Sequence, residues 1–173
     1  MVADAGFDLI HAFDTAAVDF PFLHGAPRLG LIIANTRALW PRFLAARRTD
    51  PELLAAEHPL DLYTERTLAR AFPGERIWFG HTHYDGAWIP IQRLADAVGF
   101  AWLSPEHFSI HPIYGPWIGL RAVVALAGDP PHTTRITPPC TCGDRDTCTV
   151  GREHRYSDDQ LRYHYTKDRA LLV

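Results

Sequence analysis

The chain has 173 residues, of which 47% are hydrophobic, so it is long and apolar enough to build one ordinary core. Its net charge of −3 gives no long-range attraction for phosphate backbones, which argues against a nucleic-acid-binding protein. No apolar run approaches the roughly 20 residues of a membrane-spanning helix, and the acidic start lacks the basic flank of a signal peptide. We therefore expect a cytoplasmic protein.

Hydrophobic periodicity, together with the positions of proline and glycine, predicts helices that alternate with strands. Phe7, Ile10 and Phe13 recur at helical spacing near the start of the chain. In chain order we expect a helix over 1–19, a strand over 29–35, a helix over 38–48, a short helix from 51, a helix over 60–72, a strand over 76–81, a loop over 82–88, a helix over 90–98, strands over 100–103 and 120–126, and a helix over 158–172. Strands joined mainly by helices predict an α/β or α+β layer, with helices against a small sheet.

The stretch 108–126 combines a bent loop with a buried strand. Two prolines and two glycines stiffen and bend the loop, and Tyr114 and Trp117 supply flat apolar area with polar tips. Arg121 interrupts the apolar strand that follows. A permanent cation in apolar surroundings needs an anionic or carbonyl partner, which is either a structural carboxylate or a ligand.

Three cysteines and a histidine cluster in an irregular segment at about 130–154, at Cys140, Cys142, Cys148 and His154. Thiolates and imidazole suit zinc or an iron–sulfur centre, although the spacing is not that of a standard zinc finger. The odd number of cysteines argues against a disulfide framework. A metal site, a redox-active thiol and a set of reduced loop thiols all stay open.

His81 and His83 form a second possible ligand pair at the end of a predicted strand. Side chains two residues apart share a strand face, so the two imidazoles can converge on one metal or ligand. The alternative is a polar strand end with exposed histidines.

The segment from Ile110 to Leu126 closely resembles the His-Pro-aromatic-Gly-x-Trp loop and following strand of the CblC (MMACHC) family of cobalamin-processing proteins. The chain is more distantly similar to the cobalamin domain of epoxyqueuosine reductase. Weaker similarities follow in order over 20–44, 89–102 and 155–172. The resemblance implies a single cobalamin-binding domain over 1–173, with an α+β, flavin-reductase/nitroreductase-like fold and a small, mostly antiparallel sheet flanked by helices.

Members of this family hold cobalamin without its lower base and remove its upper axial ligand, reductively for cyanide and by glutathione attack for alkyl groups. The resemblance thus implies an enzyme of cobalamin processing with cobalamin and a small thiol as partners, no nucleic acid, no membrane, and a homodimer. A non-catalytic cobalamin carrier and a metal-binding or flavin-type reductase without corrin binding remain alternatives. Asp96 stands where the human-type protein has a histidine.

The resemblance also assigns residues to the site. Arg121 falls on a family arginine tied to thiol binding, and Arg169 falls on another family arginine. The catalytic candidates are Arg121, Cys140, Cys142 and Cys148; the cofactor-binding candidates are Trp102, Phe108, Ile110, His111, Pro112, Tyr114, Gly115, Pro116, Trp117 and Arg169; and the candidates for binding zinc or iron–sulfur are Cys140, Cys142, Cys148 and His154.

Overall fold

A four-stranded antiparallel sheet forms the centre of the computed structural model, which describes residues 2–142 and 145–172. The strand order is β1-β2-β8-β3, with β1 at Leu9–Asp14, β2 at Leu29–Asn35, β3 at Arg76–Phe79 and β8 at Gly119–Leu126. The two apolar runs that predicted buried strands, β2 and β8, lie side by side in the middle of the sheet. This position lets both of their faces be covered.

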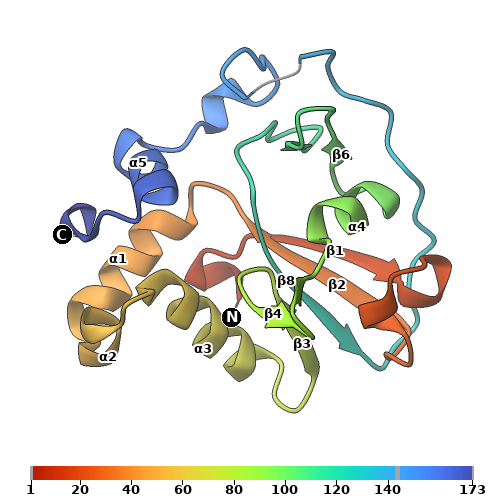
Figure 1. The fold of residues 1–173 in the computed structure, drawn as a ribbon, viewed down its shortest axis with the longest axis horizontal. Helices are drawn as coiled ribbons and strands as arrows, with labels where there is room; N and C mark the ends of the chain where they lie inside the picture. Colours follow the sequence, from red (N-terminus) through yellow and green to blue (C-terminus); the bar gives the residue numbers. More distant parts are fainter. Residues whose placement is uncertain (1, 143–144, 173) are drawn as a thin grey trace.

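Helices cover both faces of the sheet (Figure 1). The side chains of β8 alternate between the two faces. Ala122 and Val124 pack with α1, α3 and α5, whereas Val123 and Ala125 pack with α4. The helix bounds are α1 Leu39–Thr49, α2 Pro51–Ala55, α3 Pro59–Ala71, α4 Ile91–Ala97 and α5 Asp158–Thr166, and short 3-10 turns occur at Ala3–Ala5, Thr15–Ala17, Pro21–Leu23, Arg152–His154 and Arg169–Leu171.

The predicted N-terminal helix is wrong, because Leu9–Asp14 form β1, which pairs with β2. Phe13 is fully buried while Ile10 is half exposed, so the helical spacing of these residues does not mark one face. Phe13 lies opposite Gly30, where any Cβ would collide with its ring. Glycine therefore leaves the space that the ring fills, and pairing across the sheet overrides the local pattern.

The loop expected over 82–88 is instead a β-hairpin, with β4 at His83–Tyr84 and β5 at Ala87–Trp88. Its turn is Asp85-Gly86, and both residues have positive φ, as a tight hairpin turn requires. A second small pair joins β6, Trp102–Leu103, to β7, Ser109–Ile110.

The segment after β8 is irregular, as predicted. Residues 127–142 and 145–151 form neither helix nor strand, and 143–144 lie outside the described residues. An ion pair of 3.0 Å between Asp96 and Arg135 ties this segment to α4. In the described part of the chain, no helix is long and apolar enough to cross a membrane.

Candidate functional site

An open cavity of about 560 Å³ lies at the edge of the sheet where β8 begins. Its volume is within the range of about 300–1,000 Å³ that is usual for small-molecule sites. The wall is built from the start of α4 and the residues that lead into it, both ends of the segment 107–119, the start of β8, residues of α5, and single residues from elsewhere in the chain. The lining residues are Gly80, Trp88, Ile89, Pro90, Ile91, Gln92, Arg93, Leu103, His107, Phe108, Ser109, Pro116, Trp117, Ile118, Gly119, Leu120, Arg121, Arg145, Tyr156, Leu161, His164 and Tyr165.

Arg121 reaches the cavity from a β-bulge. The register of β2 against β8 shifts so that Ile33 pairs with Ala122 and Ala34 with Leu120, which leaves Arg121 as the extra residue. Its carbonyl still accepts a hydrogen bond of 2.8 Å from the N–H of Gly80, which follows β3 on the side of β8 opposite to β2. A bulge re-aims the side chain of the extra residue, and bulges are frequent beside active sites.

The guanidinium of Arg121 is held by an amide rather than by an acid. Its Nε donates a hydrogen bond of 2.6 Å to Oδ1 of Asn35, which is fully buried at the end of β2. Burial lowers the pKa of Arg121. No ion pair joins Arg121 to a carboxylate within the described ranges. Arg121 therefore has no direct carboxylate partner, although the charge of the more distant Asp61 acts on its pKa in the opposite direction to burial.

Buried polar groups without partners are concentrated at this cavity. Four buried side-chain polar atoms of the described residues lack a hydrogen bond, and three belong to lining residues: Ser109 Oγ, Trp117 Nε1 and the Tyr156 hydroxyl. An unsatisfied buried polar group costs about 1–3 kcal/mol. Such groups gathered on one wall fit a site whose hydrogen-bond partners come from a ligand.

Tyr156 lies close to the Arg121–Asn35 pair. Burial raises the pKa of its hydroxyl, and the positive charge of Arg121 and the nearby Asn35 side chain partly offset this effect. The hydroxyl makes no hydrogen bond of ordinary geometry to the residues described. It is a buried, neutral polar group next to the Arg121–Asn35 pair.

The cavity wall is cationic. The lining contains Arg93, Arg121 and Arg145 but no aspartate or glutamate among the described residues. The guanidinium of Arg145 lies 5.5 Å from the ring centre of Trp117 and 4.8 Å from that of Tyr165, and it also donates to the Tyr165 hydroxyl. The wall therefore favours a ligand that carries carboxylates or other acceptors.

His164 lies on the exposed rim of the cavity. Desolvation lowers its pKa, and the nearby cations Lys167, Arg121 and Arg145 lower it further. The imidazole at this rim is therefore neutral at neutral pH and adds a polar group without adding charge.

Four of the predicted site residues line the cavity together: Phe108, Pro116, Trp117 and Arg121. Two others do not line the cavity: Ile110 is fully buried, and it pairs with the half-buried Trp102 between β7 and β6. Arg169 lies away from the cavity lining. It is exposed, and its Nη2 donates to the Leu54 carbonyl at 3.0 Å.

The remaining predicted residues shape the tip of the loop. His111 and Gly115 form an isolated bridge, and Pro112 is exposed between them. Nδ1 of His111 accepts hydrogen bonds from the N–H groups of Ile113, at 3.1 Å, and Tyr114, at 3.3 Å. Burial lowers the pKa of His111 to about 4, so it is neutral. These residues hold the turn that presents Pro116 and Trp117 to the cavity.

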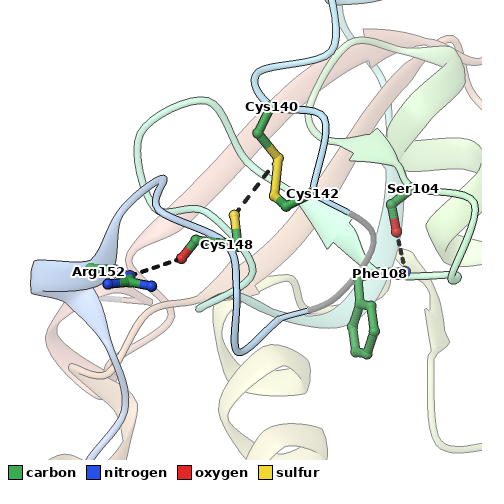
Figure 2. The surroundings of a disulfide bond; sticks show 6 residues. All are labelled: Ser104, Phe108, Cys140, Cys142, Cys148 and Arg152. Atoms are coloured by element: carbon green, nitrogen blue, oxygen red, sulfur yellow. Dashed lines mark hydrogen bonds between the residues drawn. A yellow bond between two sulfur atoms is a disulfide. The ribbon is translucent and has the colours of Figure 1, made fainter.

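The three cysteines come together, as Figure 2 shows. Cys140 and Cys142 form a disulfide, which corrects the expectation drawn from the odd number of cysteines. Cys148 is free and fully buried, with its sulfur 3.7 Å from that of Cys140. His154 is not in this group, because its ring packs on Tyr114 with the ring centres 4.7 Å apart. The metal site stays a prediction.

The two histidines near β3 do not converge. His81 lies between two carboxylates of α3, with Nε2 2.9 Å from Glu65 and Nδ1 3.7 Å from Asp61. His83 instead packs on Trp88, with ring centres 3.7 Å apart. In the part of the chain that is described, the cysteines are the group of three or more residues that could hold a metal ion.

Several lining residues were not predicted from the sequence. His164 and Tyr165 follow Leu161 at helical spacings of three and four residues, so the periodicity of α5 placed them on one face. Asn35, which holds Arg121 but does not itself line the cavity, was visible as the polar residue that ends an apolar strand. No sequence signal identifies Tyr156.

The sequence matches no protein-family model and no curated protein. Its fold does match a solved structure of a Caenorhabditis elegans B12-trafficking protein, CblC, a homologue of human MMACHC. The two chains are 17% identical, and the match has a TM-score of 0.57 and covers 95% of this chain and 77% of the other. The chain therefore has the predicted α+β, nitroreductase-like fold, with an antiparallel sheet between helices, that is found in this CblC protein.

Proposed function

We propose that this chain binds cobalamin without its lower base and promotes the loss of the upper axial ligand. The observation that carries the proposal is the cavity at the start of β8, whose lining combines Arg121 with the buried, unpaired polar atoms of Ser109, Trp117 and Tyr156. The segment that resembles the CblC family supplies the loop that forms part of this wall, and the fold of a B12-trafficking protein supports the same interpretation.

The donors in this wall fit cobalamin and a small thiol as ligands. The corrin rim carries amide side chains whose carbonyl oxygens accept hydrogen bonds from groups such as Trp117 Nε1 and the Tyr156 hydroxyl. The cavity is open on one side, so a ligand larger than about 560 Å³ can extend out of it. The carboxylates of glutathione match the charge of Arg121, whereas Arg145 is already paired with Asp146 at 3.0 Å.

The residues of the chain act by positioning and by excluding water. Trp117, Phe108 and Ile118 supply apolar wall, and Arg121 is held in place by Asn35. A thiol held by its carboxylates reacts as if it were highly concentrated beside the substrate. Without a nitrogen ligand below it, cobalt is easier to reduce and its upper bond is easier to attack.

Removal of the upper ligand needs no reacting group from the protein. For an alkyl ligand, the thiolate sulfur bonds to the alkyl carbon, the cobalt–carbon bond breaks, and its electron pair stays on cobalt as Co(I). The products are a thioether and reduced cobalamin, and the thiol proton goes to water. For cyanide, an external reductant supplies the electron and cyanide leaves.

Anaerobic turnover of methylcobalamin with glutathione tests the proposal. We expect S-methylglutathione by mass spectrometry, together with the absorbance of reduced cobalamin, in amounts that exceed the protein. Binding without product would identify a carrier instead. Unchanged cobalamin at an excess of protein would contradict both readings and favour a reductase or metal protein on the same fold.

A further inference from the structure

We propose that Cys140, Cys142 and Cys148, once reduced, form a three-thiolate zinc site that fixes the segment carrying Arg145 at the cavity wall. The zinc site rests on the sulfur geometry alone, and only its link to cobalamin chemistry rests on the proposed function. The ligand atoms of the three residues all lie within 4.8 Å of one another.

The separation between the sulfurs of Cys140 and Cys148 fits a zinc centre. Two thiolates bonded to tetrahedral zinc at about 2.3 Å lie roughly 3.8 Å apart. The sulfurs of Cys140 and Cys148 are already 3.7 Å apart, without a bond between them. The disulfide uses two sulfurs and leaves Cys148 as a buried thiol that faces them, whereas zinc uses all three.

The conversion of the disulfide form to the zinc form balances in electrons and protons. A dithiol reductant donates two electrons and two protons to the Cys140–Cys142 bond and becomes a disulfide itself. Zinc then binds the three sulfurs and releases their protons to water. A disulfide sulfur is not a thiolate, so the oxidised form and the zinc form exclude each other.

Zinc is favoured over an iron–sulfur cluster. Common clusters are held by four protein ligands, usually cysteines, and the whole sequence contains three cysteines. Zinc accepts three protein ligands and a water or small ligand in the fourth position. The described histidines and acids contribute no further member to the group.

The backbone around Cys148 holds its sulfur in place and adds positive charge nearby. The Cys148 N–H donates to the Arg145 carbonyl at 3.3 Å. Nε of Arg152 donates to the Cys148 carbonyl at 3.2 Å, as Figure 2 shows. Three thiolates on zinc carry a net negative charge, and the Arg152 side chain, which donates to the Cys148 carbonyl, supplies a cation beside this turn. Because the Arg145 side chain lies on Trp117 and Tyr165, the cluster connects directly to the cavity wall.

The test uses the full-length chain without cobalamin, reduced anaerobically with a dithiol, incubated with Zn²⁺ and desalted. We expect about one zinc ion per chain. Cys148→Ser should lose most of this zinc, whereas the matched control His154→Ala should keep it, because His154 lies outside the sulfur group. Co²⁺ should give the intense sulfur-to-cobalt charge-transfer band of a thiolate site.

Thiol protection keeps the proposal testable if a cysteine variant fails to fold. Zinc should protect all three thiols of the reduced wild-type chain from alkylation. Unprotected thiols, or equal zinc in Cys148→Ser and wild type, would overturn the site. Zinc binding by a chain that leaves cobalamin unchanged would refute the proposed function and leave the zinc site standing.

Discussion

The Nε of Arg121 donates a hydrogen bond of 2.6 Å to Oδ1 of Asn35, which joins β8 to β2 at the floor of the cavity. The bond forms where the register of the two strands shifts. A Cβ at Gly119 would lie 2.7 Å from the same Oδ1, so glycine there leaves room for the pair. A neutral amide orients the cation without neutralising it, and the charge stays available to a ligand.

Replacement of Arg121 by methionine should weaken thiol binding strongly and lower the stability of the fold only modestly. A hydrogen bond to a charged group is worth about 1.5–3 kcal/mol, so we expect KM for glutathione to rise about 10- to 150-fold. Stability should fall by about 1–3 kcal/mol, because the fully buried Oδ1 of Asn35 loses its donor. Steady-state kinetics and urea denaturation measure the two effects.

Arg169→Met is the matched control for this experiment. Arg169 is exposed and donates to the Leu54 carbonyl, away from the cavity lining, so its loss should leave KM for glutathione unchanged. Equal effects of the two substitutions would instead support the sequence-based placement of both arginines in the thiol site.

Tyr156→Phe separates a ligand contact from a structural one. The hydroxyl is buried and unpaired, so its removal should change the free energy of unfolding by less than about 1 kcal/mol. If the hydroxyl donates to the ligand, cobalamin or thiol affinity should fall by about 5- to 10-fold. A large loss of stability with unchanged affinity would show that the hydroxyl serves the fold.

Acid should weaken the fold through His111. Burial lowers the pKa of His111 from 6.5 to about 4, so the unfolded chain takes up the proton first as the pH falls. Stability present above pH 6.5 is therefore lost progressively toward pH 4, by about 1–2 kcal/mol after allowance for solvent screening.

Urea denaturation at neutral and mildly acidic pH measures this loss. His111→Asn keeps an oxygen acceptor for the N–H groups of Ile113 and Tyr114 but cannot titrate, so its stability should vary less with pH. The control His132→Asn changes an exposed side chain and should keep the wild-type pH dependence. An identical slope for all three proteins would rule out the role given to His111.

Gly115→Ala tests the contact between the central loop and the Cys-containing segment. Gly115 has a φ of +57°, and a Cβ there would collide with the Val150 carbonyl. We expect a loss of about 2–5 kcal/mol from backbone strain and crowding together. Gly25→Ala, with a φ of +72° but no atom within 4 Å, should lose only about 1–2 kcal/mol in the same denaturation experiment. Equal losses would mean that the two segments are not tightly packed.

The parts of the fold that could be predicted from sequence were those set by local pattern. The apolar run Leu120–Leu126 is a buried strand, and Pro59–Ala71 is a helix close to its predicted bounds. The prediction for the start of the chain was wrong because Phe7, Ile10 and Phe13 have helical spacing although Leu9–Asp14 form a strand. Only pairing with β2, some twenty residues away, decides that this segment is a strand.

The site residues on β8 and on the loop before it could be predicted from the sequence. The residues that the chain after β8 adds to the cavity could not. Arg121 was recognised as a cation in need of a partner, yet Asn35 stands 86 positions away and is joined to it only by the sheet register. Tyr156 and Arg145 come from the irregular segment and its end, where no periodicity fixes their orientation. Unpaired polar atoms are a property of packing, which sequence pattern does not report.

An anaerobic absorbance titration of methylcobalamin and cyanocobalamin with the purified chain tests the central proposal most directly. We predict a shift to the spectrum of cobalamin without its lower base that saturates as the protein approaches excess. A spectrum that remains that of free cobalamin at protein excess would contradict the proposed function.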